Sequence, residues 1–288
     1  MDRGTASGLL IANQSAAATF KTIDFPGASL TALEGVGPGG HIVGFYNDAG
    51  GHQHGFLLAG GSFTSIDYPG AVATDARGIG PDGDIVGTFL NAPGGPVNLH
   101  GYLLSHGTFL ALTDQAQGYP GMIPQRITPT GDIYGCVHIV DFGANMRGFV
   151  RDAAGNYTVF SVPSSMHQGA TPDGSVIAGL YNDLSTGRTH GYLVVNGDFE
   201  PFDVPNSNLT QSWDINVRKE VVGQFRDLKG GVHGFLLSGP GGVFTTIDVS
   251  GARGTAARGI TPRGDIVGWY IDSMGHQHGF LRSVAGSD

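Results

Sequence analysis

The sequence predicts an all-β fold, a single six-bladed β-propeller with four antiparallel strands in each blade. Three observations lead to this prediction: an excess of glycine, a repeat of about 45 residues, and four short apolar runs within each repeat. Of the 288 residues, 50 are Gly, 14% are charged and 40% are hydrophobic. So much Gly excludes long helices, because each Gly in a helix interior costs about 1 kcal/mol. The hydrophobic content excludes disorder.

Six similar units make up almost the whole chain. They start near residues 20, 63, 109, 157, 199 and 244, and each spans between 42 and 48 residues. The second and sixth units are very similar: Phe63–Ala71 and Ala76–Gly87 in one correspond to Phe244–Ala252 and Ala257–Gly268 in the other. A period near 45 residues is typical of propeller blades, because other solenoid repeats usually contain a helix or are much shorter.

Each unit contains four runs of apolar, β-branched or aromatic residues, separated by Gly, Pro, Asn and Asp. This pattern is typical of short strands joined by tight turns. Between the first two runs of the second unit, Pro81 presets φ and Gly83 permits a positive φ, so a tight turn is expected there. The strands predicted in that unit are Ala73–Ile79, Ile85–Leu90, Gly101–Leu104 and Phe109–Leu112.

The phase of the repeat predicts how the ring closes. The last unit ends after its third strand, Gly279–Leu281, whereas Phe20–Asp24 at the start of the chain supplies an extra fourth strand. We therefore expect this N-terminal strand to join the last sheet, which would leave the ring without an unpaired edge. The predicted domains are an N-terminal extension, residues 1–19, and the propeller, residues 20–288.

Charge and composition restrict the partners of the protein. With 15 Lys and Arg against 24 Asp and Glu, the formal net charge is -9, which disfavours the phosphate backbone of a nucleic acid. The sequence has no polybasic cluster for an anionic membrane and no apolar run near the ~20 residues that a spanning helix needs. Cys136 is the single cysteine, so no intrachain disulfide can form. We expect a monomer that binds a small-molecule ligand, with neither nucleic acid nor membrane as a partner.

A longer pattern recurs within the units. Gly78–Gly87 and Gly259–Gly268 read Gly-Ile-x-Pro-x-Gly-Asp-Ile-Val-Gly, and a later His-Gly-Phe-Leu stands at His54–Leu57 and His278–Leu281. This pattern resembles the bacterial extracellular HAF repeats, which are named for a His-Ala-Phe tripeptide; here Gly takes the middle position. The resemblance implies a propeller-like fold and an extracellular or periplasmic location, but no settled activity and no catalytic residues. The apolar stretch Leu9–Ala12 is too short to predict a signal peptide.

One position in the predicted inner strands, just before the Gly-Ile pair, differs sharply between units. Five of its six residues are polar, although an inner strand should otherwise be apolar and small. Such side chains could orient a polar or anionic ligand in the central funnel. In the alternative, they pair with each other and plug the channel. The substrate-binding candidates are Arg77, Gln125, Gln168, Trp213 and Arg258, and the sixth residue, Glu34, is a catalytic candidate.

The third and fourth units depart furthest from the repeat and contain the other catalytic candidates. His138 or His167 near the funnel mouth could transfer a proton, because the unperturbed pKa of histidine lies near neutrality. Glu34 or Tyr134 could complement either histidine. Cys136 could act as a nucleophile together with His138, and a buried, unreactive cysteine is the alternative.

Residues that recur at one repeat position in most units are interpreted as scaffold. The histidines of the tripeptide would lie a blade width apart, too far for the ~2 Å bonds of one zinc ion, and are expected to hydrogen-bond the adjacent turn. The aspartates after the outer strands are expected to cap turn N–H groups. No metal site and no cofactor is predicted, although carboxylates in the loops before the tripeptide leave a bound calcium or other divalent metal as an alternative. These residues are His54, His100, His190, His233 and His278, with Asp24, Asp67, Asp203 and Asp248.

Three hypotheses about function follow. The first is a small-molecule-processing enzyme, a hydrolase or lyase, with one asymmetric site in the central funnel on the face where the inner strands begin. The second is a noncatalytic propeller that binds carbohydrate or another ligand, and the third is a scaffold for protein contacts. The divergent inner-strand position favours the first, because a multivalent binder should repeat its ligand residues in most blades.

Overall fold

The computed structural model describes residues 18–93, 98–112, 119, 121–138 and 146–284. These residues form 24 strands and no α-helix, so the all-β prediction is confirmed. No helix in this described part is long and apolar enough to span a membrane. Most of the predicted N-terminal extension, residues 1–17, lies outside the described residues.

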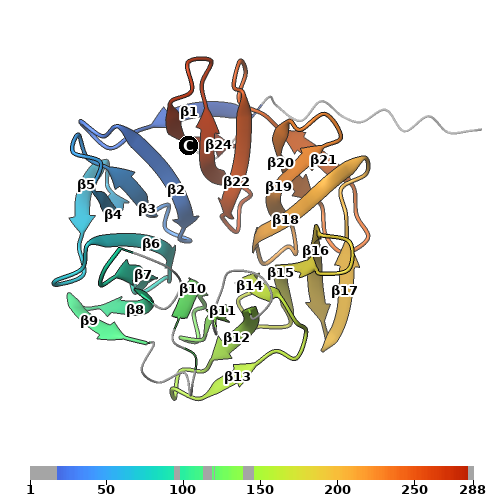
Figure 1. Ribbon diagram of the computed structural model, residues 1–288, viewed down its shortest axis with the longest axis horizontal. Coiled ribbons are helices and arrows are strands. Elements are labelled where there is room, and N and C mark those ends of the chain that lie inside the picture. The colour runs from blue at the N-terminus through green and yellow to red at the C-terminus, as the bar shows by residue number, and fades with distance from the viewer. Residues whose placement is uncertain (1–17, 94–97, 113–118, 120, 139–145, 285–288) are drawn as a thin grey trace, which may run out of the picture.

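The strands pair in six antiparallel groups of four, which we call blades 1 to 6 and which surround a common axis (Figure 1). Each blade runs from an inner strand beside the axis to an outer strand at the periphery. Blade 1 contains β2 (Leu30–Val36), β3 (Ile42–Asn47), β4 (Gln53–Ala59) and β5 (Ser62–Ile66). Blade 2 contains β6 (Ala73–Ile79), β7 (Ile85–Leu90), β8 (Leu99–Ser105) and β9 (Thr108–Ala111). Blade 3 contains β10 (Gly121–Ile127), β11 (Ile133–His138), β12 (Met146–Arg151) and β13 (Tyr157–Val159).

The second half of the ring follows the same plan. Blade 4 contains β14 (Ser165–Ala170), β15 (Val176–Asp183), β16 (Arg188–Val195) and β17 (Asp198–Phe202). Blade 5 contains β18 (Ser207–Ile215), β19 (Val221–Asp227), β20 (Val232–Leu237) and β21 (Phe244–Ile247). Blade 6 contains β22 (Gly254–Ile260), β23 (Ile266–Ile271), β24 (Gln277–Ser283) and, from the start of the chain, β1 (Thr19–Ile23).

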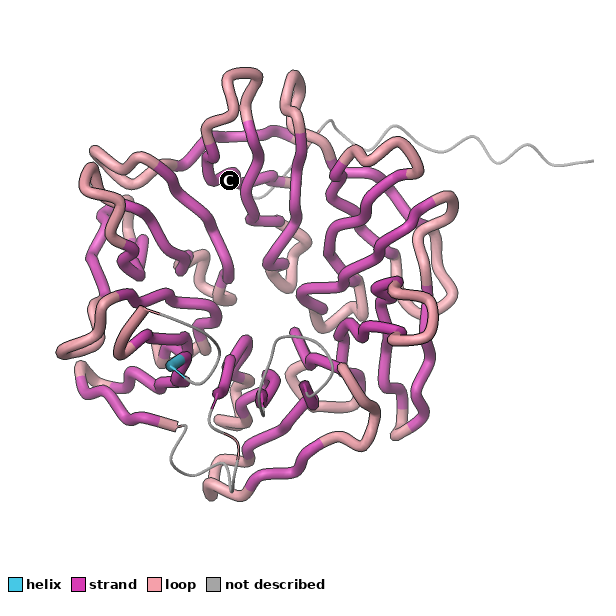
Figure 2. The backbone as a smooth tube through the Cα atoms, viewed as in Figure 1, coloured by secondary structure: helices cyan, strands magenta, loops and turns pink. Residues whose placement is uncertain are grey.

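Two single residue pairs join blades 4, 5 and 6 into one 12-stranded sheet, whereas blades 1 to 3 are separate four-stranded sheets. Thr189 of β16 pairs in parallel with Leu209 of β18, and Val232 of β20 pairs with Gly254 of β22. Because each bridge is one residue long, the six groups stay distinct in their antiparallel pairing. Figure 2 shows that strands form the body of the ring and that loops connect them, some at the periphery and some beside the centre.

The N-terminal strand pairs with the last strand of the chain, as predicted. β1 forms antiparallel residue pairs with β24, from Thr19 opposite Ser283 to Ile23 opposite Gly279. Blade 6 therefore takes three strands from the end of the chain and one from its start. This pairing covers the N–H and C=O groups that β24 would otherwise expose at an edge.

The strands predicted in the second unit agree closely with the structure. β6 and β7 have the predicted bounds, and the ends of β8 and β9 differ from the prediction by at most two residues. Gly83 has a φ of 87° in the turn between β6 and β7, a conformation that would strain most side chains. The tight turn expected there is thus present.

The apolar core lies between neighbouring blades. Between blades 1 and 2, Val43 of β3 packs in one cluster with Ala76 of β6 and with Ile85 and Phe89 of β7. Successive side chains of a strand point to opposite faces of its sheet. Each blade therefore packs one set of side chains against the preceding blade and the other set against the following blade. This arrangement leaves the polar residues of the inner strands close to the axis.

Four of the five recurring histidines pair with the four recurring aspartates. This differs from the prediction, in which both would bond turn backbone. Gly55 pairs with Ile66 across β4 and β5, so the residues just outside this pair, His54 and Asp67, also meet. Nδ1–Oδ distances of 2.7 to 2.9 Å occur in His54–Asp67, His190–Asp203, His233–Asp248 and His278–Asp24. The last of these pairs joins β24 to the residue after β1 and so supports the closure of the ring.

Gly78 lies where the inner strands of blades 2 and 3 come close together. A Cβ atom at Gly78 would lie 2.6 Å from the carbonyl oxygen of Gln125 and 2.9 Å from Cα of Arg126. Since these are backbone atoms, we predict that Gly78→Ala lowers the free energy of unfolding in urea by about 1–3 kcal/mol. Gly39→Ala is the control, because a Cβ there would meet no atom within 4 Å. An equal loss in both variants would contradict the prediction.

Candidate functional site

Every inner strand carries an irregularity at the same place. The register between the inner strand and the second strand of each blade skips one residue. Such a β-bulge leaves that residue out of the ladder and re-aims its side chain. The six bulge residues are the six that diverge in sequence: Glu34, Arg77, Gln125, Gln168, Trp213 and Arg258.

The residue after the bulge is glycine in four blades, which lets the inner strands approach each other near the axis. Arg126 takes this place in blade 3, and Asp214 takes it in blade 5. Neither residue was among the predicted site residues. Aligning the six units at this position would have identified them, because a cation and a carboxylate stand where the other four units have no side chain.

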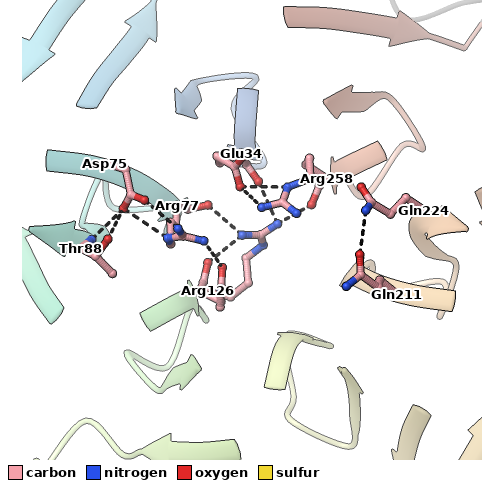
Figure 3. Close-up of polar contacts among 9 residues, drawn as sticks. Glu34, Asp75, Arg77, Thr88, Arg126, Gln211, Gln224 and Arg258 are labelled. Carbon is pink, nitrogen blue, oxygen red and sulfur yellow. Dashed lines mark hydrogen bonds and ion pairs between the residues drawn. The ribbon is translucent and has the colours of Figure 1, made fainter. Parts of the chain in front are cut away.

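Arg126 lies at the axis and bonds the backbone of four blades (Figure 3). Its Nη1 donates to the carbonyl oxygens of Arg77 and Gln125, both at 2.7 Å. Its Nη2 donates to the carbonyl oxygens of Glu34 at 3.0 Å and Arg258 at 2.5 Å. These carbonyls belong to the bulge residues of blades 1, 2, 3 and 6, so one guanidinium connects four inner strands.

Asp214 connects Arg126 to blade 5. Its Oδ1 lies 3.2 Å from Nε of Arg126. The carboxylate also accepts the backbone N–H groups of Ile215 at 3.0 Å and Ile260 at 3.1 Å. Burial raises the pKa of Asp214, although Arg126 and these two N–H groups act in the opposite direction. Each nitrogen of the Arg126 guanidinium therefore faces at least one oxygen atom.

A second ion pair lies beside Arg126, between blades 1 and 6 (Figure 3). Glu34 Oε2 accepts from Nε of Arg258 at 2.9 Å and also from its Nη2. The Arg258 guanidinium lies 3.5 Å from the ring centroid of Trp213, a cation–π contact. Burial lowers the pKa of Arg258, and the charge of Glu34 opposes this shift.

A third ion pair belongs to blade 2. Arg77 Nη2 donates to Asp75 Oδ2 at 2.7 Å, and Arg77 Nη1 donates to Gln125 Oε1 at 3.4 Å. Burial alone would lower the pKa of Arg77, but the charge of Asp75 raises it. The three ion pairs together carry three positive and three negative charges, so the residues around the axis are balanced.

Five of the six bulge side chains contact one another, which is the alternative to the predicted ligand-lined channel. Arg77 bonds Gln125, and Arg258 contacts both Glu34 and Trp213. Gln168 differs, because its side chain is fully buried and neither Oε1 nor Nε2 has a partner among the described residues. A binding role for these side chains would therefore compete with their own contacts.

His167 is buried beside blade 3 instead of lying near a funnel mouth, so its predicted position is wrong. Its exposed fraction is 1%, and Nδ1 lies 2.6 Å from the hydroxyl of Tyr192. Its ring covers Gly148 and lies 5.0 Å, centroid to centroid, from the ring of Phe160. Burial lowers the pKa of His167 to about 3, far below the neutral range that suits a general base.

The remaining catalytic candidates are buried as well. Burial raises the pKa of Tyr134, which is 4% exposed. Cys136 Sγ lies 3.1 Å from Nε2 of His138, and burial raises the pKa of this thiol to about 12. Since the thiolate is the nucleophile, Cys136 fits the unreactive alternative. Among the described residues, no hydrogen bond or ion pair joins Glu34, Tyr134 and His167 to one another, and no group of three or more His, Cys, Asp and Glu side chains is placed to hold a metal ion.

A funnel opens at the face where the inner strands end, opposite to the predicted face. Isoleucines from the ends of four inner strands line it, and five blades add a proline from the following turn. Val217 takes the place of this proline in blade 5. The charged residues of the lining are Arg126 and Asp214, so an apolar wall surrounds one ion pair.

No family model and no curated protein matches the chain. Among solved structures, TolB from Acinetobacter baumannii matches with a TM-score of 0.60 at 12% identity, over 84% of this chain and 63% of that chain. The β-propeller domain of the trilobed protease from Pyrococcus furiosus matches with a TM-score of 0.54 at 10% identity, over 89% of this chain and 94% of that chain. The chain has a β-propeller fold. The Aleuria aurantia lectin matches with a TM-score of 0.51 at 12% identity, over 93% of this chain and 95% of that chain.

Replacing Arg126 by Met would leave Asp214 buried without its cation. We predict that Arg126→Met lowers the free energy of unfolding in urea by about 3–5 kcal/mol. Asp214→Asn in the same chain should recover part of this loss, because it removes the unpaired charge. Arg218→Met is the control: Arg218 is 48% exposed in its pair with Glu220, and its loss should cost less than about 1 kcal/mol. Equal costs for the two Arg variants would show that Arg126 does not hold the ring together.

We predict that His167 stays neutral from about pH 8 to about pH 5, seen as constant NMR shifts of its imidazole. In the unfolded chain the His167 imidazole takes up a proton near its ordinary pKa of 6.5, whereas in the native protein its pKa is about 3. The free energy of unfolding therefore falls as the pH drops below 6.5 toward 3. His167→Gln should reduce that fall. His278 provides the contrast, because partial burial lowers its pKa but hydrogen bonds to Asp24 and Asp272 raise it overall. Parallel titration of both histidines would contradict the prediction.

Proposed function

We propose that the chain is a single six-bladed propeller that binds one small ligand in the axial funnel and does not transform it. The observation that carries this proposal is the pairing of an apolar wall with one buried ion pair, Arg126–Asp214, in the axial funnel. Small-molecule sites are commonly concave and apolar with a few polar groups that orient the ligand. Both charged residues occur where the other four units have glycine. The polar groups of the funnel therefore do not follow the symmetry of the repeat, as expected for a site that binds one ligand.

The chemistry of the lining favours a ligand with an apolar body and a hydrogen-bond-donating or cationic end. The Nη1 and Nη2 donors of Arg126 are directed at four carbonyl oxygens, which leaves them unsuited to a ligand anion. Asp214 Oδ2 accepts the N–H of Ile260 and has a further lone pair. The polar end of the ligand would therefore bond Asp214, in contrast to the anionic ligand suggested by the two arginines at the bulge position.

Binding is preferred to catalysis because of the protonation states of the candidate groups. An imidazole with a pKa of about 3 and a thiol with a pKa of about 12 are poor participants in proton transfer or nucleophilic attack near neutral pH. The hydrolase or lyase hypothesis therefore has no support from His167 or Cys136. Similar propellers occur in a protease and in a lectin, so the fold itself is compatible with either class of function.

The location and the assembly state of the protein stay predictions. The HAF-like repeats support an extracellular or periplasmic location, and one pairing of β1 with β24 within the chain is compatible with a monomer.

Three probes that share one aromatic ring test the proposed ligand chemistry: benzamidine, indole and benzoate. We predict that benzamidine, with its cationic donor, binds most tightly in ligand-observed NMR and calorimetry, and that benzoate binds most weakly. Val217→Trp should narrow the funnel mouth and weaken benzamidine binding at least about tenfold, since it removes most of the buried contact. Val243→Trp is the control, because Val243 is equally a surface valine but does not line the funnel. Binding that is indifferent to Val217→Trp, or tightest for benzoate, would refute the proposal.

A further inference from the structure

A second cavity lies between blades 1 and 2. Its lining includes Ala73 at the start of β6 and Asp75 two residues later, whereas the axial funnel is lined by Ile79 at the end of β6. The cavity and the funnel have no lining residue in common. They are therefore independent sites at opposite ends of one inner strand.

The polar residues of this cavity are particular to blade 2. Asp75 of the inner strand is paired with Thr88 of the second strand. At the same place blade 5 has Gln211 opposite Gln224, and these two amides bond each other at 2.7 Å (Figure 3). The other four blades have pairs without charge or hydroxyl groups: Ala32–Phe45, Ile123–Cys136, Met166–Leu180 and Ala256–Trp269.

Asp75, Arg77 and Thr88 form a network that keeps hydrogen-bonding capacity. Asp75 Oδ1 accepts the N–H of Thr88 at 2.9 Å, its hydroxyl at 2.7 Å, and Nε of Arg77 at 3.2 Å. Asp75 Oδ2 accepts one N–H from Arg77 at 2.7 Å. Of the five N–H donors of a guanidinium, the side chain of Arg77 uses three in the described structure, the third on Gln125. Two donors of Arg77 therefore remain, next to acceptor positions on Asp75 Oδ2 and on the Thr88 oxygen.

The charge of this network is balanced. The Arg77 guanidinium is neutralised by Asp75 and also feels the charge of Glu34. A ligand anion would gain from Arg77 but would lie beside two carboxylates, and a ligand cation would meet Arg77 itself. Paired donors and acceptors without net charge match hydroxyl groups, since each hydroxyl both donates and accepts.

The rest of the lining completes such a site. Gln53 of blade 1 adds an amide, with both a donor and an acceptor, and Phe45, Phe89 and Leu99 add apolar surface. We propose that this cavity binds a neutral polyhydroxylated compound of about the size of a monosaccharide. Its hydroxyls would bond Arg77, Thr88 and Gln53, while its C–H groups contact the apolar side.

The test uses ligand-observed NMR and calorimetry with D-glucose, D-galactose, D-mannose and L-fucose at millimolar concentration, and with D-glucuronate and D-glucosamine as charged counterparts. At least one neutral sugar should bind more tightly than both D-glucuronate and D-glucosamine. If no neutral sugar binds, or if glucuronate binds more tightly than all of them, the proposal is wrong.

Matched variants then locate the bound sugar. Gln53→Ala should raise its Kd about fivefold, the effect of one lost hydrogen bond, and Thr88→Val should raise it further. Gln277→Ala is the control, because Gln277 starts the same Gln-His-Gly-Phe sequence in blade 6 and does not line the cavity. Gln53 lies at the first residue of β4 and is partly exposed, so its variant tests the site even if Thr88→Val fails to fold. Sugar binding that responds to Val217→Trp and not to Gln53→Ala would place the sugar in the axial funnel and overturn this proposal without affecting the funnel's role in binding.

Discussion

The guanidinium of Arg126 is the interaction on which the centre of this propeller depends. It bonds carbonyl oxygens from four inner strands and forms an ion pair with Asp214 from a fifth. A buried ion pair adds little stability compared with a well-packed apolar pair, but removing one partner is costly. The inner strands meet here through glycines, which bring no side chain to fill the axis. A planar cation with five donors suits a ring of converging carbonyls, so Arg126 replaces the apolar core that the glycines cannot provide.

The same constraint organises the function that we propose. Because Arg126 and its neighbours occupy the axis, the funnel and the interblade cavity are separate, one at each end of the inner strands. Both sites arise from departures from the repeat: Arg126 and Asp214 replace glycine, and Asp75 with Thr88 replaces an apolar or amide pair. Each departure comes with a partner that balances its charge. The symmetric scaffold can therefore hold charged residues near its axis and still present two chemically different recesses.

The local structure of this protein could be predicted well from its sequence, and the site only in part. β6 and β7 follow residue for residue from apolar runs and turn residues, and the phase of the repeat predicted the pairing of β1 with β24. The divergent bulge position was also visible, but whether its side chains face a ligand or each other depends on distances between blades that no single unit encodes. For the same reason His167 could not be placed, since it is buried against Gly148 of the neighbouring blade as well as Phe160 and Tyr192. Asp214 and Arg126 are 88 residues apart in sequence and meet only when the ring closes.

The most direct test of this account is the exchange of guanidinium protons with water, measured by NMR on protein labelled with 15N-arginine. Exposed side chains such as Arg218 should exchange their Nε protons quickly. Arg126 should exchange its guanidinium protons far more slowly, because its nitrogens face backbone carbonyls and Asp214 inside the ring. Exchange of Arg126 as fast as that of Arg218 would mean that its bonds to the four carbonyls and to Asp214 do not persist, and the account of the centre given above would be wrong.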